Sequence, residues 1–434
     1  MAIQKKKGVF DLQANNTTAG REILAGITTF LTLAYILMVN PDILSAAGMP
    51  KEGVFTATAL ASAIATLVMA LAANLPIALA PGMGLNAFFA FSVVIGMGYS
   101  WQIALTAVFF EGILFIILSL FNVREAIIKA IPDNLKKAVA VGIGLFIALI
   151  GFKNAGIVIG DQATLVALGD LASGSALLAI IGLVITIILY AWKIPGSILI
   201  GILATTAIGI PLGVTDVSGF GSPFSLPAAP LLWEFDFSNI FTFQFFTVFF
   251  TFLFVDVFDT VGTLVGVTSQ AGLIDKNGEI PRVKQALLAD AVGTVAGAVL
   301  GTSTVTSYVE STAGVAVGGR TGLAALTTAL LFVVALFFAP LFLLIPGAAT
   351  APALIVVGFL MMQAVGGINF KDPTEGIPAF FSIVMMPFAY SISEGVVYGL
   401  LSYVILKAVT LKFKDISIIT WILFVVFILR FFIE

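Results

Sequence analysis

The chain alternates between long apolar stretches and short breaks rich in glycine, proline and charged residues. Apolar stretches near twenty residues long are typical of helices that cross a membrane. The pattern predicts fourteen such spans, near residues 22–40, 54–74, 84–97, 101–121, 135–152, 176–192, 195–213, 241–266, 284–300, 307–318, 322–345, 351–366, 376–390 and 393–410. A last apolar stretch ends in Arg430 and Glu434, and the pattern leaves open whether it crosses the membrane or lies along its surface.

The composition agrees with a membrane protein. Of 434 residues, 60% are hydrophobic and 10% are charged, which is too much apolar surface for a water-soluble core and excludes a soluble enzyme. Cysteine and histidine are absent, so disulfides and Cys/His metal sites are excluded, and a proton must be carried by a carboxylate, lysine, tyrosine or water. We expect the lipid bilayer as a partner, and neither a metal nor a nucleic acid.

The distribution of lysine and arginine predicts the orientation of the chain. Residues 1–21 have a basic start without a cleavage site and are read as a cytoplasmic N-terminal tail of a multi-pass protein of the cell membrane. With that start, only Lys51 and Lys153 fall outside, as the positive-inside rule requires. The residues predicted inside are Lys5, Lys6, Lys7, Arg21, Arg124, Lys129, Lys136, Lys137, Lys193, Lys276, Arg282, Lys284, Arg320, Lys371, Lys407, Lys412 and Lys414.

A loop without lysine or arginine, residues 214–240, divides the predicted spans into two sets of seven and reads as an external linker. An odd number of spans makes the halves, 22–213 and 241–411, opposite in orientation, as in inverted repeats. Residues 59–89 resemble residues 287–317 at an offset of about 228, although a shared alanine and glycine content would also produce this similarity. Residues 412–434 form a separate C-terminal apolar segment.

Two predicted spans, the third and the tenth, are interrupted. "NLPIALAPGMGLNAFFAF" carries Pro76 and Pro81 before a short apolar run, and "GTSTVTSYVESTAGVAVGGRTG" is rich in β-branched and hydroxyl residues. Neither is a good continuous helix, so we expect short strand-like breaks near 80–84 and 302–307. Irregular backbone is tolerated inside a membrane only where it lines a cavity, and paired breaks therefore indicate a transporter's substrate site.

Five carboxylates fall within the predicted spans: Glu111, Asp256, Asp259, Asp290 and Glu310. A charge near the bilayer centre costs from about 2.5 to over 10 kcal/mol, so each acid needs a partner or a function. Asp256 and Asp259 lie one helical turn apart, and two acids close together in a low dielectric can exchange a proton near neutral pH. Asp259 reads equally well as a structural hydrogen-bond partner, and Glu111 and Asp290 read better as contacts between helices or as residues at the membrane edge.

Three further residues near the breaks are candidates for substrate binding. Asn86 offers a donor and an acceptor inside an apolar run. Phe88 could stack on a planar ligand, although contact with lipid is the default for any one of 39 phenylalanines, and Thr306 lies in the second break. An anion site would need lysine or arginine in the spans, and there is essentially none, which disfavours an anion as the substrate. Carboxylates, an amide, backbone groups and rings suit a flat, neutral heterocycle such as a nucleobase.

Four motifs carry a family resemblance: "EILAGITTFLTLAYILMVNPDIL", "APGMGLNAFF", "DVFDTVGTLVG" and "TSYVESTAGVAVGGRTGLAAL". They resemble the AzgA-like purine permeases, a branch of the nucleobase cation symporter and nucleobase-ascorbate transporter superfamily, from about residue 10 to the C-terminus. The resemblance implies an all-α, UraA-like fold of fourteen segments in two inverted seven-helix repeats. A core domain would contain segments 1 to 4 and 8 to 11, and a gate domain segments 5 to 7 and 12 to 14.

The same resemblance implies proton-coupled uptake of adenine, guanine or hypoxanthine, and a homodimer formed through the gate domain. By this resemblance Asp256 and Glu310 contact the base, Asn86 is implicated in binding, and Asp259 acts in structure or in the conformational cycle. We expect an elevator-like cycle in which protonation of Glu310 or Asp256 permits occlusion, with no cofactor beyond the coupling proton. A passive channel or an anion exchanger is the alternative, and sodium coupling and the preferred purine stay open.

Overall fold

The computed structural model describes residues 9–433 except 121–131, 219, 239 and 275–279. In the first half the elements are α1 (Ala19–Leu33), α2 (Ile36–Ser45), α3 (Lys51–Val68), the π-helix η1 (Met69–Ala73), β1 (Leu79–Pro81), α4 (Met83–Ala87), the π-helix η2 (Phe88–Gly96), α5 (Trp101–Leu120), α7 (Asp133–Asn154), β2 (Val158–Asp161), β3 (Leu165–Leu168), α8 (Gly174–Ala191) and α9 (Ser197–Gly209).

In the second half they are α10 (Phe243–Gln270), α11 (Val283–Leu300), β4 (Val305–Ser307), α12 (Ser311–Ala316), α13 (Gly322–Ala335), the 3-10 helix η3 (Leu336–Phe338), α14 (Ala339–Leu343), α15 (Gly347–Met362), the 3-10 helix η4 (Gln363–Gly367), α16 (Pro373–Phe388), α17 (Ile392–Val409), the 3-10 helix η5 (Phe413–Asp415) and α18 (Ile418–Ile433). Within the described residues, nine helical segments are long and apolar enough to cross a membrane. The multi-pass membrane architecture is therefore confirmed.

Most helices lie where the apolar pattern predicts them, with three differences. The first predicted span breaks between α1 and α2, the span 322–345 divides into α13, η3 and α14, and the β2–β3 hairpin is unexpected. The C-terminal apolar stretch forms α18, which packs edge-on through Phe427 against Phe250 of α10. The predicted inside residues Lys5, Lys6, Lys7, Arg124, Lys129 and Lys276 lie outside the described residues.

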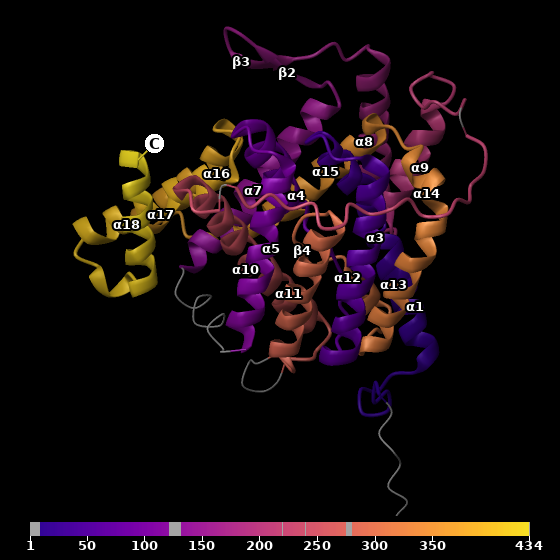
Figure 1. Cartoon of the computed structure of the whole chain (residues 1–434), viewed down its shortest axis with the longest axis horizontal. Coiled ribbons are helices and arrows are strands. Elements are labelled where there is room, and N and C mark those ends of the chain that lie inside the picture. Colours follow the sequence, from indigo (N-terminus) through magenta and orange to yellow (C-terminus); the bar gives the residue numbers. More distant parts are fainter. Residues whose placement is uncertain (1–8, 121–131, 219, 239, 275–279, 434) are drawn as a thin grey trace, which may run out of the picture.

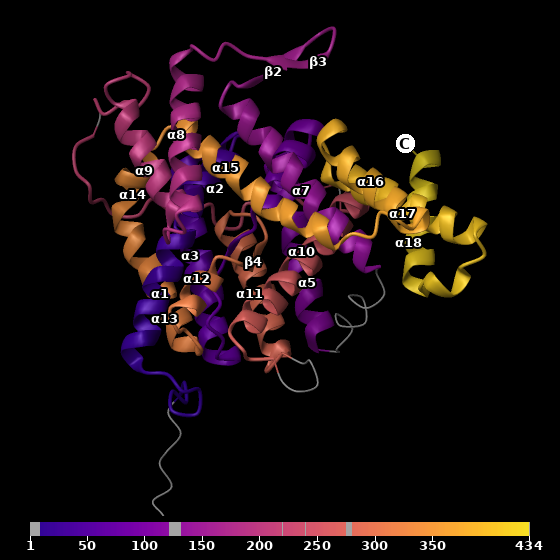
Figure 2. The same ribbon diagram turned by 180° about the vertical axis from the view of Figure 1, so that it is seen from behind.

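The described helices pack into two groups. One contains α1, α3, α5, α10, α11, α12 and α13, and the other contains α7, α8, α9, α15, α16 and α17. Most of the second group lies above the first in Figures 1 and 2, with the β2–β3 hairpin at the top. Small residues bring backbones together within a group: a Cβ atom added at Gly144 of α7 would lie 2.7 Å from the carbonyl oxygen of Gly358 in α15.

The two predicted breaks meet as a short antiparallel strand pair. β1 pairs with β4 in the register Leu79↔Ser307, Ala80↔Thr306 and Pro81↔Val305. Proline lacks an N–H and restricts the residue before it, so the proline-containing stretch at β1 cannot continue a helix. The expected strand-like breaks in the third and tenth spans are therefore confirmed.

Candidate functional site

The strand pair is held by one threonine from each half of the chain. The Thr66 hydroxyl of α3 accepts from the Leu79 N–H (2.9 Å) and donates to the Leu79 carbonyl (3.1 Å). The Thr294 hydroxyl of α11 accepts from the Val305 N–H (3.3 Å) and donates to the Val305 carbonyl (3.0 Å). Each threonine satisfies backbone groups that would otherwise be buried and unpaired, so each strand is held by the helix that precedes it.

A cavity of about 820 Å³ lies between the two helix groups. Glu310 and Asp259 line it from one group, with Thr32, Val255, Thr263, Val265, Val309, Thr312 and Ala313. The other group contributes Asp133, Lys136, Lys137, Val139, Ala140, Ile143, Tyr190, Val357, Leu360 and Met361, with Gln363 and Ala364 of η4. The cavity thus has mainly apolar walls with a few polar groups, as small-molecule sites do.

The Glu310 side chain is fixed by a tyrosine at the break between α1 and α2. The Tyr35 hydroxyl donates to Glu310 Oε1 at 2.5 Å, and Tyr35 is fully buried. Two residues before Glu310, Tyr308 is tied to the other strand, since its N–H donates to the Ala78 carbonyl (2.9 Å) and its hydroxyl to the Pro81 carbonyl (2.6 Å). The segment that carries Glu310 is therefore fixed through Tyr308, and the Glu310 carboxylate is fixed through Tyr35.

Asp259 lies on the α10 wall of the cavity, close to the end of β1. A Cβ atom added at Gly82 would lie 3.5 Å from Asp259 Oδ2 and 2.6 Å from Thr306 Cγ2. Gly82 also donates its N–H to the Thr304 carbonyl at 2.9 Å. Glycine is needed here for close approach between β1, β4 and α10, which brings both cavity acids beside the strand pair.

Asp256 lies behind this wall, in a buried network around one threonine hydroxyl. Thr260 Oγ1 lies 2.5 Å from Asp290 Oδ1, 2.8 Å from Thr306 Oγ1 and 3.4 Å from Asp256 Oδ1. Both aspartates are fully buried, and neither they nor Thr306 are among the residues that line the cavity. The structure therefore brings the sequence-predicted residues Asp256 and Thr306 together with Asp290. These three lie outside the cavity that Glu310 and Asp259 line.

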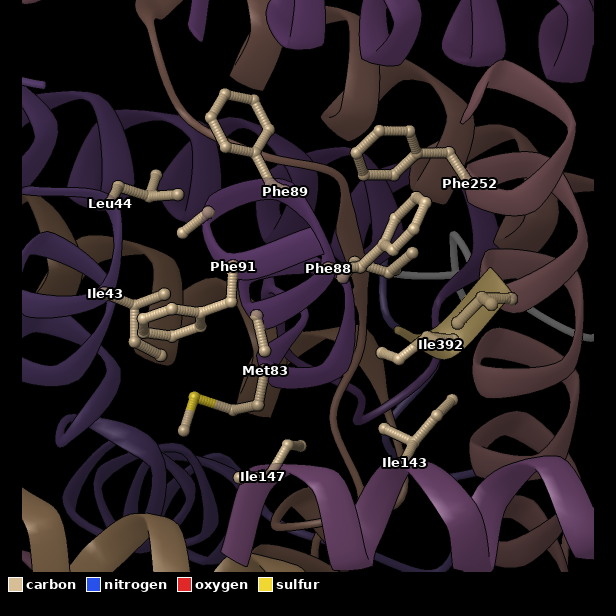
Figure 3. Close-up of a cluster of buried hydrophobic side chains, with 14 of the residues drawn as sticks. Ile43, Leu44, Met83, Phe88, Phe89, Phe91, Ile143, Ile147, Phe252 and Ile392 are labelled. Carbon is tan, nitrogen blue, oxygen red and sulfur yellow. The ribbon is translucent and has the colours of Figure 1, made fainter. Parts of the chain in front are cut away.

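Asn86 and Phe88 are buried in the half-helix that follows β1. The Asn86 amide donates to the Pro81 carbonyl at 3.3 Å, and its Oδ1 has no hydrogen-bond partner among the described residues. The Phe88 ring points to Phe252 of α10 in an edge-on contact at 4.8 Å, within the cluster of Figure 3. In this arrangement Phe88 packs between helices and does not line the cavity.

Glu111, for which the sequence left open a contact between helices or a place at the membrane edge, is fully buried and reaches the strand pair. Its Oε2 accepts from the Thr304 hydroxyl at 2.7 Å, and Thr304 is the residue whose carbonyl accepts from Gly82. α5 is thereby tied to the segment that enters β4. Sequence reasoning missed Tyr35, whose only signal was a polar hydroxyl within the apolar motif "FLTLAYILMV".

The chain is similar to a known protein family and to named relatives in other organisms. A model described as the permease family matches residues 20–397. The chain is 45% identical to an adenine permease of Escherichia coli (strain K12), over 97% of this chain and 95% of that protein. It is 47% identical to a guanine/hypoxanthine permease of Bacillus subtilis (strain 168), over 98% of this chain and 100% of that protein.

Among solved structures, the chain resembles the transmembrane domain of a cyanobacterium bicarbonate transporter. The TM-score is 0.67 at 17% identity, over 88% of this chain and 97% of that one, which is a likeness of fold alone. Since the family model covers most of the chain and both relatives match it nearly end to end, the chain belongs to the permease family, and its predicted place among the AzgA-like purine permeases is confirmed.

Proposed function

We propose that this protein is a secondary transporter that imports a purine nucleobase (adenine, guanine or hypoxanthine) by proton symport. Its membership of a permease family and the names of its relatives favour a transporter over an enzyme. The observation that carries the proposal is the cavity between the two helix groups, because two carboxylates, Glu310 and Asp259, meet there beside interrupted backbone.

A purine fits the chemistry of this cavity. Its ring N–H groups are donors, which suit the carboxylate oxygens of Glu310 and Asp259, and its flat faces suit apolar walls such as Val139, Ile143 and Val357. Lys136 and Lys137 also line the cavity, near the start of α7. The contacts of Asp256, Asn86, Phe88 and Thr306 with the base stay predictions, because none of these residues lines the cavity in this arrangement.

The mechanism that we propose is an elevator. The group containing α1, α3 and α10 would be the core domain that carries the base, and the group containing α7 and α15 would be the gate domain. The matching roles of Thr66 and Thr294 support two inverted seven-helix repeats, 22–213 and 241–411, joined by the linker 214–240. The homodimer, the cytoplasmic N-terminus and the proton as coupling ion are further parts of this proposal.

Uptake in cells that lack their own purine permeases tests the function. Radiolabelled hypoxanthine, guanine and adenine are compared, with uracil as the control substrate and with or without a protonophore. We expect saturable accumulation of at least one purine, which the protonophore collapses. A passive channel would equilibrate the base without concentrating it, and an anion exchanger would leave purines outside, so either result would refute purine symport. Replacing external sodium with choline tests sodium coupling in the same assay.

A further inference from the structure

The break between α1 and α2 places an uncharged donor on the Glu310 carboxylate. The Tyr35 hydroxyl donates to Glu310 Oε1 at 2.5 Å, at the short end of the range for O–H···O bonds to ionised groups. Tyr35 occupies the position just before α2, where its side chain makes no capping hydrogen bond, and its ring is fully buried. The Tyr35 side chain is therefore not engaged by the helix start, and its hydroxyl is directed to Glu310.

This hydrogen bond restricts the plane of the carboxylate. The last torsion of a glutamate side chain has a broad, nearly two-fold preference, so a free carboxylate rotates easily. A phenol has one hydrogen, and here it engages one of the two carboxylate oxygens. The Tyr308 contacts with β1 fix the backbone two residues earlier. The carboxylate also accepts from the Glu310 backbone N–H, so Tyr35 is the contact from another segment that determines how the end of this side chain lies.

We propose that Tyr35 is a positioning residue for the purine: it holds Glu310 Oε1 and leaves Oε2 to accept an N–H of the base. This inference rests on the proposed function, since it assumes that the base meets Glu310. Tyr35 is not itself among the residues that line the cavity, so it acts through Glu310. A carboxylate fixed in this way loses less freedom when the base binds, and the affinity is correspondingly higher.

The substitution Glu310→Gln makes the proposal sharp, because a glutamine has one acceptor end and one donor end. The Tyr35 hydroxyl could also accept from an NH₂ group, but its own hydrogen would then lose its acceptor. With Tyr35 present, we therefore expect the hydroxyl to donate to the amide oxygen and to turn the NH₂ group towards the base, where it faces another donor. With Tyr35→Phe, the amide is free to flip and present its oxygen to the base. Loss of the Tyr35 hydroxyl should therefore weaken purine binding when residue 310 is glutamate, and should not weaken it in the Glu310→Gln variant.

The experiment is a double-mutant cycle on purine binding by the purified full-length protein in detergent. The ligand is the purine that the wild type binds most tightly among hypoxanthine, guanine and adenine. We expect Tyr35→Phe to raise Kd by roughly ten-fold in the Glu310 background, as for loss of one hydrogen bond to a charged group. In the Glu310→Gln background the same change should leave Kd unchanged or lower it.

Tyr308→Phe is the matched control, because it removes a hydroxyl from the same site that engages the Pro81 carbonyl and not Glu310. Its cost should be equal in both backgrounds. Glu310→Asp is a second background, in which the shorter side chain withdraws from Tyr35 and the effect of Tyr35→Phe should vanish.

Each failure has a distinct signature. An unchanged Kd for Tyr35→Phe, or an equal loss in the Glu310, Gln and Asp backgrounds, would overturn the positioning role. Absence of purine binding by the folded wild type would instead overturn the proposed function. Melting temperatures of all variants, measured without ligand, separate loss of folding from loss of affinity.

Discussion

Gly82→Ala tests whether the close approach of the strand pair builds the site. The added methyl group would lie 2.6 Å from Thr306 Cγ2 and 3.2 Å from Leu85 Cδ1. Carbon atoms prefer about 3.5–4.0 Å, so the neighbours must separate by about 1 Å. Gly82 has φ −71° and ψ 126°, which alanine also adopts, so the effect comes from contact and not from backbone strain.

The expected magnitude follows from how little the neighbours can move. Thr306 is held at 2.8 Å by Thr260, and the Gly82 N–H is held at 2.9 Å by the Thr304 carbonyl. Overpacking at a fixed site costs about 1–3 kcal/mol. If this cost falls on the ligand-bound arrangement, Kd rises by about 5- to 150-fold.

The assay measures purine Kd and melting temperature for Gly82→Ala beside a matched control, Gly266→Ala. Gly266 lies in the same helix as Asp259, and a Cβ atom added there would meet nothing within 4 Å. The control should keep the wild-type Kd and melting temperature. If Gly82→Ala kept the wild-type Kd and melting temperature, the strand pair would have moved to make room for the methyl group at no cost. The close approach at Gly82 would then not be needed to build the site.

Three other predictions concern single carboxylates. Glu310→Gln should abolish accumulation of purine against its gradient, because an amide cannot carry the coupled proton; retained uphill uptake would rule out Glu310 as the coupled acid. Glu22 is fully buried and accepts from the Arg320 N–H (2.9 Å) and the Thr321 N–H (3.2 Å), so Glu22→Ala should lower stability by roughly 1–3 kcal/mol for each unpaired group, and an unchanged melting temperature would contradict this. The Thr374 backbone N–H and hydroxyl, with Lys412, lower the pKa of Asp372 to about 2. The stability from this cap is therefore full above the unfolded value near 4 and is lost as the pH falls towards 2. Asp372→Asn should remove that dependence, which thermal melts between pH 5 and 3 would detect as a flatter curve.

The positions of the helices and of both breaks could be predicted because their causes are local. Apolar runs give the helices, and the prolines at 76 and 81 and the β-branched residues at 304–306 give the strands. The β2–β3 hairpin also had a local signal, an Asp161 turn between apolar runs, but it lies between two predicted spans and no element was predicted there.

The layering of the acids could not be predicted, because it depends on contacts between distant segments. Spacing placed Asp256 and Asp259 on nearly the same face of one helix, yet only Asp259 lines the cavity. Thr260 links Asp256 to Asp290, which belongs to another helix. Tyr35 meets Glu310 across 275 residues of chain, and no pattern near either residue indicates the contact.

The β1–β4 pair also determines when the fold of this protein can close during synthesis. Beside β1, the Gly82 N–H and the Ala78 carbonyl have their partners in Thr304 and Tyr308. At about 5–20 residues per second, the ribosome makes those partners roughly 10–45 seconds after β1 itself. Until then one edge of β1 has unpaired backbone groups, which hydrocarbon cannot satisfy. We therefore expect the newly inserted first half to be held by the insertion machinery until β4 arrives, so that closure of the strand pair is a late step of biogenesis.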